Sequence, residues 1–216
     1  SNSSQTIIDC FIKEILTLGI SVLKGQPVKE IHAQDSAWII KTRSDLYLAQ
    51  KVVIATGSNP KIWNVLKGLQ HTIIPPVPSL FTFNIKDQRI LDLPGVSKEV
   101  SVKVMGSNGK VVLESEGPLL ITHWGMSGPA ILKLSAWGAR VLEAVSYKFT
   151  VIVNWLLYET QEDVLERLLK LKTKHPKQTV LKYAQFEVPK RLWQSLVQTS
   201  GIDAAEIWAD ISKNKL

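Results

Sequence analysis

Residues 28–60 read VKEIHAQDSAWIIKTRSDLYLAQKVVIATGSNP, and this stretch decides the fold of the first part of the chain. Three short strand-like runs separated by polar turns predict a small antiparallel meander; the runs are Val28–His32, Ala37–Thr42 and Leu46–Ala49. A continuous apolar run, Val52–Ala55, follows and ends abruptly at Thr56-Gly57. A short apolar run closed by glycine is typical of a strand buried on both faces. The stretch therefore predicts a meander that leads into a buried strand.

The sequence before and after this stretch has further patterns. Residues 5–18 carry apolar side chains at helical spacing, which predicts an amphipathic helix. Residues 75–115 place prolines and glycines between short alternating runs, a pattern typical of an all-β, barrel-like part. A helix is expected from about residue 130 to residue 145, and residues 149–157 alternate again and predict a strand.

From Thr160 onward the pattern is helical, and Thr160 followed by Asp163 resembles a capping box. The fold class is therefore α+β. We expect four parts in chain order: a helix with a β-meander (1–60), a β-barrel-like part (61–158), a small helical bundle (159–205) and a short closing segment (206–216).

The composition excludes several classes of function. The 216 residues include 45% hydrophobic and 21% charged residues, which is ordinary for a globular protein, and no apolar run is long enough to cross a bilayer. One cysteine and no paired histidines exclude a zinc site of the usual spacing, so no metal is expected. A single cysteine also fits a reducing, cytoplasmic compartment. Six tryptophans lie in apolar runs and are expected in the core: Trp38, Trp124, Trp137, Trp155, Trp193 and Trp208.

The formal net charge of +7 leaves an anionic partner open. Most lysines are spread along the chain and are not interleaved with aromatic residues, so a solvated surface is the favoured interpretation and nucleic acid is not the expected partner. One basic cluster stands apart and could contact phosphates or be a solvated helix end; it comprises Lys170, Lys172, Lys174, His175, Lys177 and Lys182. A non-enzymatic nucleic-acid-binding module that uses this helical part is the alternative function.

The step Ala55-Thr56-Gly57 carries a resemblance to a class of flavoproteins. A meander followed by an apolar strand and this step is similar to the end of the FAD-binding domain in two-dinucleotide-fold flavoproteins, where the chain turns beside the dinucleotide. Glycine at the carboxyl end of a strand lets bare backbone approach a ligand. The resemblance implies that Ala55, Thr56 and Gly57 lie on the cofactor side.

A second, more specific resemblance covers residues 5–212. His71-Thr72-Ile73, Pro78-Ser79-Leu80, Leu93-Pro94-Gly95-Val96 and the run from Gly117 to Leu132, GPLLITHWGMSGPAIL, occur in this order. The series resembles the aminoacetone-oxidase-like family of FAD-dependent oxidoreductases, in which a β-barrel and a small helical bundle are inserted into a split dinucleotide-binding fold. The resemblance implies transfer of electrons between FAD and a small-molecule substrate, with NAD(P)H as the electron donor and the insert shaping the substrate pocket.

The chain departs from that family's pattern in its glycines. A dinucleotide-binding fold opens with Gly-x-Gly-x-x-Gly between a strand and a helix, and no Gly-x-Gly occurs in this sequence. We therefore expect residues 1–60 to be a partial FAD-binding domain, residues 206–216 to be a return segment, and the chain to be an interior fragment. The rest of the parent chain is then its partner, and the fragment alone is expected to be inactive and not to retain FAD.

The segment from Thr122 to Pro129 is the best candidate for chemistry within the chain. Its glycines free the backbone, and a helix that begins near Pro129 would expose N–H groups able to hold an anion or a flavin edge. His123 can act as a general acid or base near physiological pH. We therefore expect His123 and Ser127 on the substrate side, although a tight strand-to-helix turn would also need these glycines.

Overall fold

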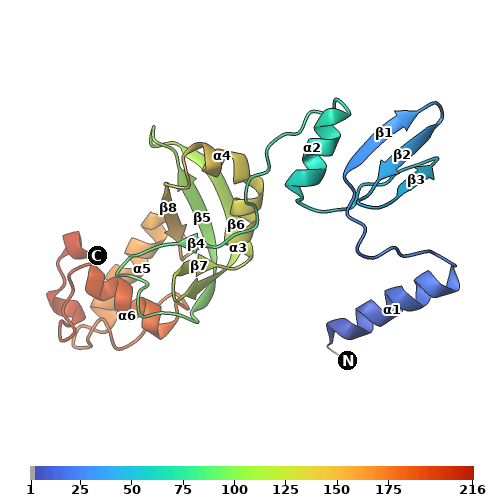
Figure 1. The fold of residues 1–216 in the computed structure, drawn as a ribbon. Coiled ribbons are helices and arrows are strands. Elements are labelled where there is room, and N and C mark those ends of the chain that lie inside the picture. Colours follow the sequence, from blue (N-terminus) through green and yellow to red (C-terminus); the bar gives the residue numbers. More distant parts are fainter. Residues whose placement is uncertain (1–2) are drawn as a thin grey trace. The chain divides into compact units, whose positions relative to one another are not determined.

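The computed structural model describes residues 3–216, and the chain divides into two compact units after Pro75 (Figure 1). Among the described residues, no helix has the length and apolar character needed to span a membrane.

The first unit contains the predicted helix and meander. Helix α1 (Ser4–Thr17) is capped by the side chain of Ser3, which accepts a hydrogen bond from the Gln5 backbone N–H at 3.2 Å. Strands β1 (Glu30–Gln34), β2 (Ala37–Lys41) and β3 (Leu46–Ala49) form an antiparallel sheet in the order β1-β2-β3. The three strand ranges agree with the three predicted runs to within two residues.

The predicted buried strand at Val52–Ala55 is wrong for the chain as it stands. These residues are irregular, and Val53 and Ile54 are 88% and 39% exposed. A strand forms only where a neighbour pairs with its backbone groups, and no described strand pairs with this run. The chain instead enters helix α2 (Pro60–Gly68), whose cap is the Asn59 side chain and whose first residue is proline, a favoured position.

The second unit is built on a curled, open five-stranded antiparallel sheet, a half-barrel. Its strands stand in the order β4-β7-β6-β5-β8, so β4 and β8 are the two edges. The strand bounds are β4 (Phe83–Asn84), β5 (Ser97–Met105), β6 (Val111–Thr122), β7 (Gly125–Ser127) and β8 (Thr150–Asn154). The expected barrel-like β part is therefore confirmed as an open sheet rather than a closed barrel.

Two short helices cover this sheet. The single helix expected over residues 130–145 is divided at Gly138 into α3 (Pro129–Trp137) and α4 (Ala139–Ala144). Helix α3 packs chiefly against β6 (Figure 1). The core between helices and sheet is fully buried, and its members include Val100, Val102, Leu119, Ile121, Ile131, Leu134 and Leu142.

The helical part closes the second unit. It consists of α5 (Gln161–Lys174), α6 (Lys190–Thr199) and two short 3-10 helices, Trp208–Asp210 and Lys213–Lys215. The capping box at α5 is confirmed, because the Thr160 hydroxyl accepts from the Asp163 N–H at 3.1 Å and the Asp163 carboxylate accepts from the Thr160 N–H at 3.2 Å.

The expectation that six tryptophans are core residues holds only in part. Trp193 and Trp208 are buried, and Trp193 donates its indole N–H to the Val180 carbonyl at 2.9 Å. Trp124 and Trp137 are instead 57% and 76% exposed. Trp124 lies in a turn and Trp137 at the end of α3, and neither position is covered by another described element.

Candidate functional site

His123 and Ser127 belong to one β-hairpin. Strands β6 and β7 pair Thr122 with Gly125 and Leu120 with Ser127, so His123 and Trp124 form the two-residue turn between the strands. The His123 side chain is exposed and Ser127 is half-buried. Neither side chain forms a hydrogen bond or ion pair with another described residue. The His123 side chain is therefore open to a substrate and that of Ser127 only in part, and their chemical roles stay a prediction.

Gly125 is required by the packing of two strands. A Cβ at this position would lie 2.2 Å from the Phe83 carbonyl oxygen and 2.5 Å from the Ile85 backbone nitrogen. Its φ of 146° also lies in the region that favours glycine. This glycine lets β4 approach β7, so the hairpin geometry explains it without a ligand. Helix α3 begins at Pro129 as expected.

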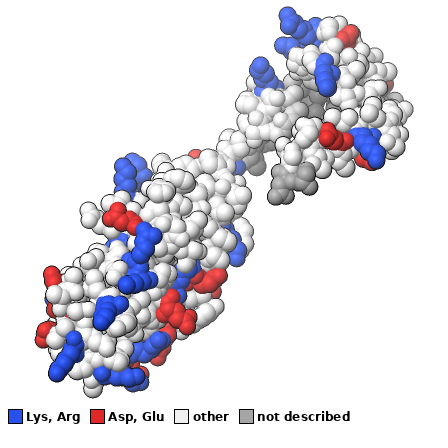
Figure 2. Space-filling model, turned by 90° about the horizontal axis from the view of Figure 1, so that it is seen from below, with Lys and Arg blue, Asp and Glu red and all other residues white. Residues whose placement is uncertain are grey.

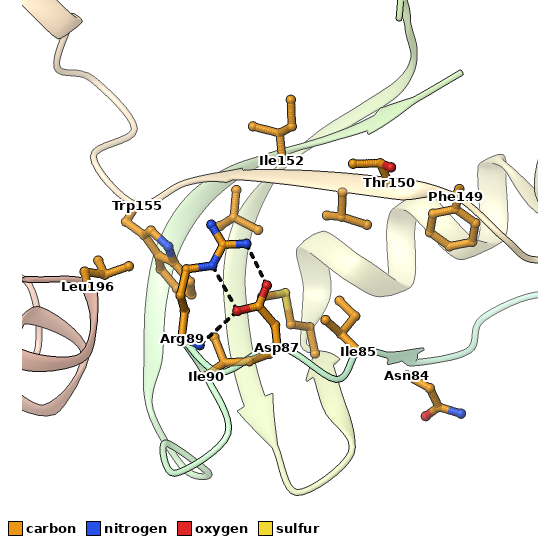
Figure 3. Close-up of a pocket in the computed structure, with 13 residues that line it drawn as sticks. Asn84, Ile85, Asp87, Arg89, Ile90, Phe149, Thr150, Ile152, Trp155 and Leu196 are labelled. Carbon is orange, nitrogen blue, oxygen red and sulfur yellow. Dashed lines mark hydrogen bonds and ion pairs between the residues drawn. The ribbon is translucent and has the colours of Figure 1, made fainter. Parts of the chain in front are cut away.

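A pocket of about 540 Å³ that could hold a small molecule lies between the two edge strands of the half-barrel (Figure 3). Asn84 comes from β4, Met126 from β7 and Thr150 from β8, while α6 contributes Leu196. Its volume lies within the range of about 300–1,000 Å³ that is usual for ligand pockets. Its walls are mostly apolar and its remaining lining residues are Ile85, Asp87, Arg89, Ile90, Phe149, Val151, Ile152, Val153 and Trp155.

Asp87 and Arg89 supply the charge in this pocket. The Arg89 guanidinium donates to both carboxylate oxygens of Asp87, from Nε at 2.9 Å and from Nη2 at 2.6 Å (Figure 3). The Arg89 backbone N–H adds a third bond at 2.8 Å. These bonds, the side-chain ones foremost, lower the pKa of Asp87 to about 2 and raise that of Arg89. The pair is therefore ionised together at neutral pH and presents a fixed, bidentate polar group to a ligand.

Sequence reasoning missed this pocket. Its walls come from segments more than 100 residues apart, and periodicity does not show which strands become the edges of a sheet. The one local signal is the Asp87-x-Arg89 spacing after a short strand.

Ala55, Thr56 and Gly57 lie in an exposed irregular segment of the first unit. Gly57 has a φ of 61°, and no atom lies within 4 Å of the place that a Cβ would take. The Asn59 backbone N–H donates to the Gly57 carbonyl at 2.9 Å, which closes a tight turn. One side of this loop is thus not covered by other described atoms. Helix α2 begins three residues after Gly57, and the cofactor role of Ala55, Thr56 and Gly57 stays a prediction.

The described residues contain no cluster of three or more histidine, cysteine, aspartate or glutamate side chains that could hold a metal ion.

The curated relatives that the chain resembles are reductases and RNA-modifying enzymes by name. The ribosomal RNA dihydrouridine synthase of Haemophilus influenzae is 24% identical over 97% of this chain and 52% of its own length. The Escherichia coli protein of the same name is 23% identical over 93% of this chain and 49% of its own length. The 3-dehydro-bile acid delta(4,6)-reductase of Clostridium scindens is 21% identical over 66% of this chain and 36% of its own length.

The chain spans about half the length of the two ribosomal RNA dihydrouridine synthases.

The second unit matches a known protein family. Residues 77–216 match the family described as HI0933-like protein barrel and H2TH domain, in agreement with the half-barrel and the helical part that follows it. The chain belongs to the HI0933-like protein barrel and H2TH domain family.

Proposed function

We propose that this chain is the interior part of an FAD-dependent reductase that saturates a carbon–carbon double bond conjugated to a carbonyl group. The observation that carries the proposal is the chemistry shared by the relatives' names. Dihydrouridine is uridine whose ring double bond, conjugated to a carbonyl, has been reduced. A 3-dehydro-bile acid with delta(4,6) unsaturation has double bonds conjugated to its 3-oxo group.

This reaction adds two electrons and two protons across the double bond. The bound, reduced flavin would supply a hydride to the carbon remote from the carbonyl, and NAD(P)H would restore the reduced flavin. The carbon next to the carbonyl then needs a proton. In this proposal His123 delivers that proton, and Ser127, in the third residue pair of the same hairpin, holds the substrate.

Exposed apolar surface on the first unit supports the proposal that other parts of the whole protein complete the FAD site. Helix α1 has no buried residue, and Phe11 and Leu16 on it are 65% and 74% exposed. The run Val52–Ala55 is apolar like an inner strand of a sheet, but no described strand pairs with it. Large exposed apolar surfaces mark places where another element packs. We propose that a dinucleotide-binding fold covers both.

The half-barrel would shape the substrate pocket. The 540 Å³ pocket between β4 and β8 has room for a ring system. Neither His123 nor Ser127 lines it, so in this proposal it binds a part of the substrate away from the reacting double bond. The Asp87–Arg89 pair gives a polar group able to orient a carbonyl, since Arg89 keeps part of its guanidinium exposed.

The test uses the whole protein with FAD. We expect flavin absorption bands, bleaching of these bands by NADH or NADPH without oxygen, and their return when cyclohexenone or a uridine-containing RNA is added. His123→Ala is expected to slow the return by about a hundredfold or more, with flavin content unchanged. A flavoprotein reoxidised only by oxygen, and by no conjugated carbonyl compound, contradicts the proposal.

A colourless protein that takes up no FAD would also contradict it. The non-enzymatic nucleic-acid-binding module would then be the better interpretation.

A further inference from the structure

Most of the positive charge of the helical part lies in one segment. Residues 167–191 hold eight lysines and arginines and a single acid, Glu187. The flanking ranges 159–166 and 192–216 together hold two basic and seven acidic residues. Figure 2 shows basic and acidic side chains side by side at the end of the second unit. The segment 167–191 is therefore strongly basic, whereas the ranges on either side of it along the sequence are acidic.

A groove of about 210 Å³ lies within this segment. Arg167, Lys170 and Lys174 line one wall, and their spacing of three and four residues places them on one face of α5. Gln185 and Phe186, from the connection between α5 and α6, line the other wall. The groove thus combines three cations, one amide and one aromatic ring.

The cations of the groove can be released to bind an external anion. Arg167 pairs with Glu159 and Lys170 pairs with Glu166, and all four side chains reach solvent. Exposed ion pairs of this kind contribute little to stability, so a phosphate can replace the carboxylate. Lys174 makes no ion pair or hydrogen bond through its side chain with a described residue.

Phe186 is held in an unusual backbone conformation beside these cations. Phe186 and Glu187 have φ values of 56° and 55°, a region that residues other than glycine rarely adopt. The Arg167 guanidinium carbon lies 4.3 Å from the centre of the Phe186 ring. Phe186 is half-buried and also packs against the hydrophobic core, so only part of its ring lines the groove.

We infer that this groove binds RNA, with Arg167, Lys170 and Lys174 on backbone phosphates and an unstacked base against Phe186. Cationic grooves with aromatic platforms are the usual way in which proteins hold single-stranded nucleic acid. The inference rests on the proposed function and names its substrate class. The two relatives that cover more than nine tenths of the chain carry ribosomal RNA in their names. The sequence alone favoured a solvated helix end, because it did not show Phe186 facing these cations.

The test measures binding of a fluorescein-labelled RNA hairpin with a uridine-rich loop to the whole protein. Lys170→Ala/Lys174→Ala is expected to weaken binding about tenfold or more at low salt and to reduce the slope of log K against log salt by about 1–2. Phe186→Leu is expected to weaken binding about fivefold or more, whereas Phe186→Tyr keeps the ring and the affinity. The matched control is Lys110→Ala/Lys148→Ala, which removes two exposed lysines of the half-barrel.

Equal binding by the groove variant and the control variant would overturn the inference, as would lysine-dependent binding of vesicles with anionic lipids but not of RNA. The result is separable from the reductase proposal. A colourless protein whose RNA affinity depends on Lys170 and Lys174 would refute the reductase and keep the groove. A protein that reduces cyclohexenone but binds RNA independently of these lysines would support the reductase proposal and refute RNA binding by the groove.

Discussion

The bidentate pair between Asp87 and Arg89 gives the pocket wall a pH-dependent contribution to stability. Because the pKa of Asp87 in the folded state, about 2, lies below its unfolded value of about 3.9, the stabilisation is present above the unfolded pKa. It is lost as the pH falls through about 2. Both side chains are partly exposed, at 58% for Arg89 and 29% for Asp87, so solvent screening reduces the stabilisation to about 1 kcal/mol.

We therefore expect Asp87→Asn to lower the free energy of unfolding by about 1 kcal/mol near neutral pH. The difference from wild type should shrink as the pH falls from about 4 toward about 2, which urea titrations at several pH values would measure. Asp92→Asn is the control, because this exposed carboxylate makes no ion pair with a described residue. A difference that stays constant down to the lowest pH would contradict the assignment.

Gly125 is the single residue whose side-chain hydrogen is most strictly needed. Gly125→Ala would force a methyl group against the Phe83 carbonyl oxygen and the Ile85 nitrogen, both of which are backbone atoms that cannot move independently. We expect a loss of about 3 kcal/mol in unfolding free energy. Gly109→Ala is the matched control, since its φ is 73° but nothing lies within 4 Å, and it should cost about 1 kcal/mol. Similar melting temperatures for the two variants would show that β4 does not approach β7 so closely.

Among the elements, α5 depends on its first turn. The Thr160 and Asp163 side chains each accept a backbone N–H from the other residue, and these bonds satisfy donors that the helix leaves unpaired. Thr160→Ala should cost about 1 kcal/mol, and Thr160→Ser should restore most of it because the hydroxyl is retained. Chemical denaturation of both variants would measure this, and an unaffected Thr160→Ala variant would indicate that packing alone fixes the start of the helix.

Elements whose signals are local were predictable from the sequence. The meander, the cap at Thr160 and the start of α3 at Pro129 each follow from a few neighbouring residues. Burial was harder, because it depends on which surfaces face each other. Val53 belongs to a run of apolar residues typical of a core strand, yet its side chain is exposed. Trp137 also lies among apolar residues of the sequence and is exposed. The pocket around Asp87 is a property of the open sheet, so no local pattern contains it.

At the scale of the whole molecule, the two units differ in how much core they possess. In the described part of the first unit, only Ile31 and Ile62 are buried hydrophobic residues. The second unit has a continuous core that runs from the sheet into the helical part. Stability follows buried apolar area, so the two units should not be equally stable. The less stable unit is the one that carries Ala55, Thr56 and Gly57, the proposed cofactor side.

This asymmetry predicts the hydrogen-exchange behaviour of the 216-residue chain. Amides of β1, β2 and β3 should exchange faster than those of β5 and β6 by more than roughly tenfold, because opening free energies fall where few apolar contacts are buried. Mass spectrometry of peptic peptides would measure this, with the hairpin of β5 and β6 as the internal reference. In the whole protein with FAD, the same comparison tests whether a dinucleotide-binding fold covers the first unit. If it does, protection of residues 30–55 rises while that of β5 and β6 stays the same; if residues 30–55 exchange equally fast in both proteins, no such fold packs on them.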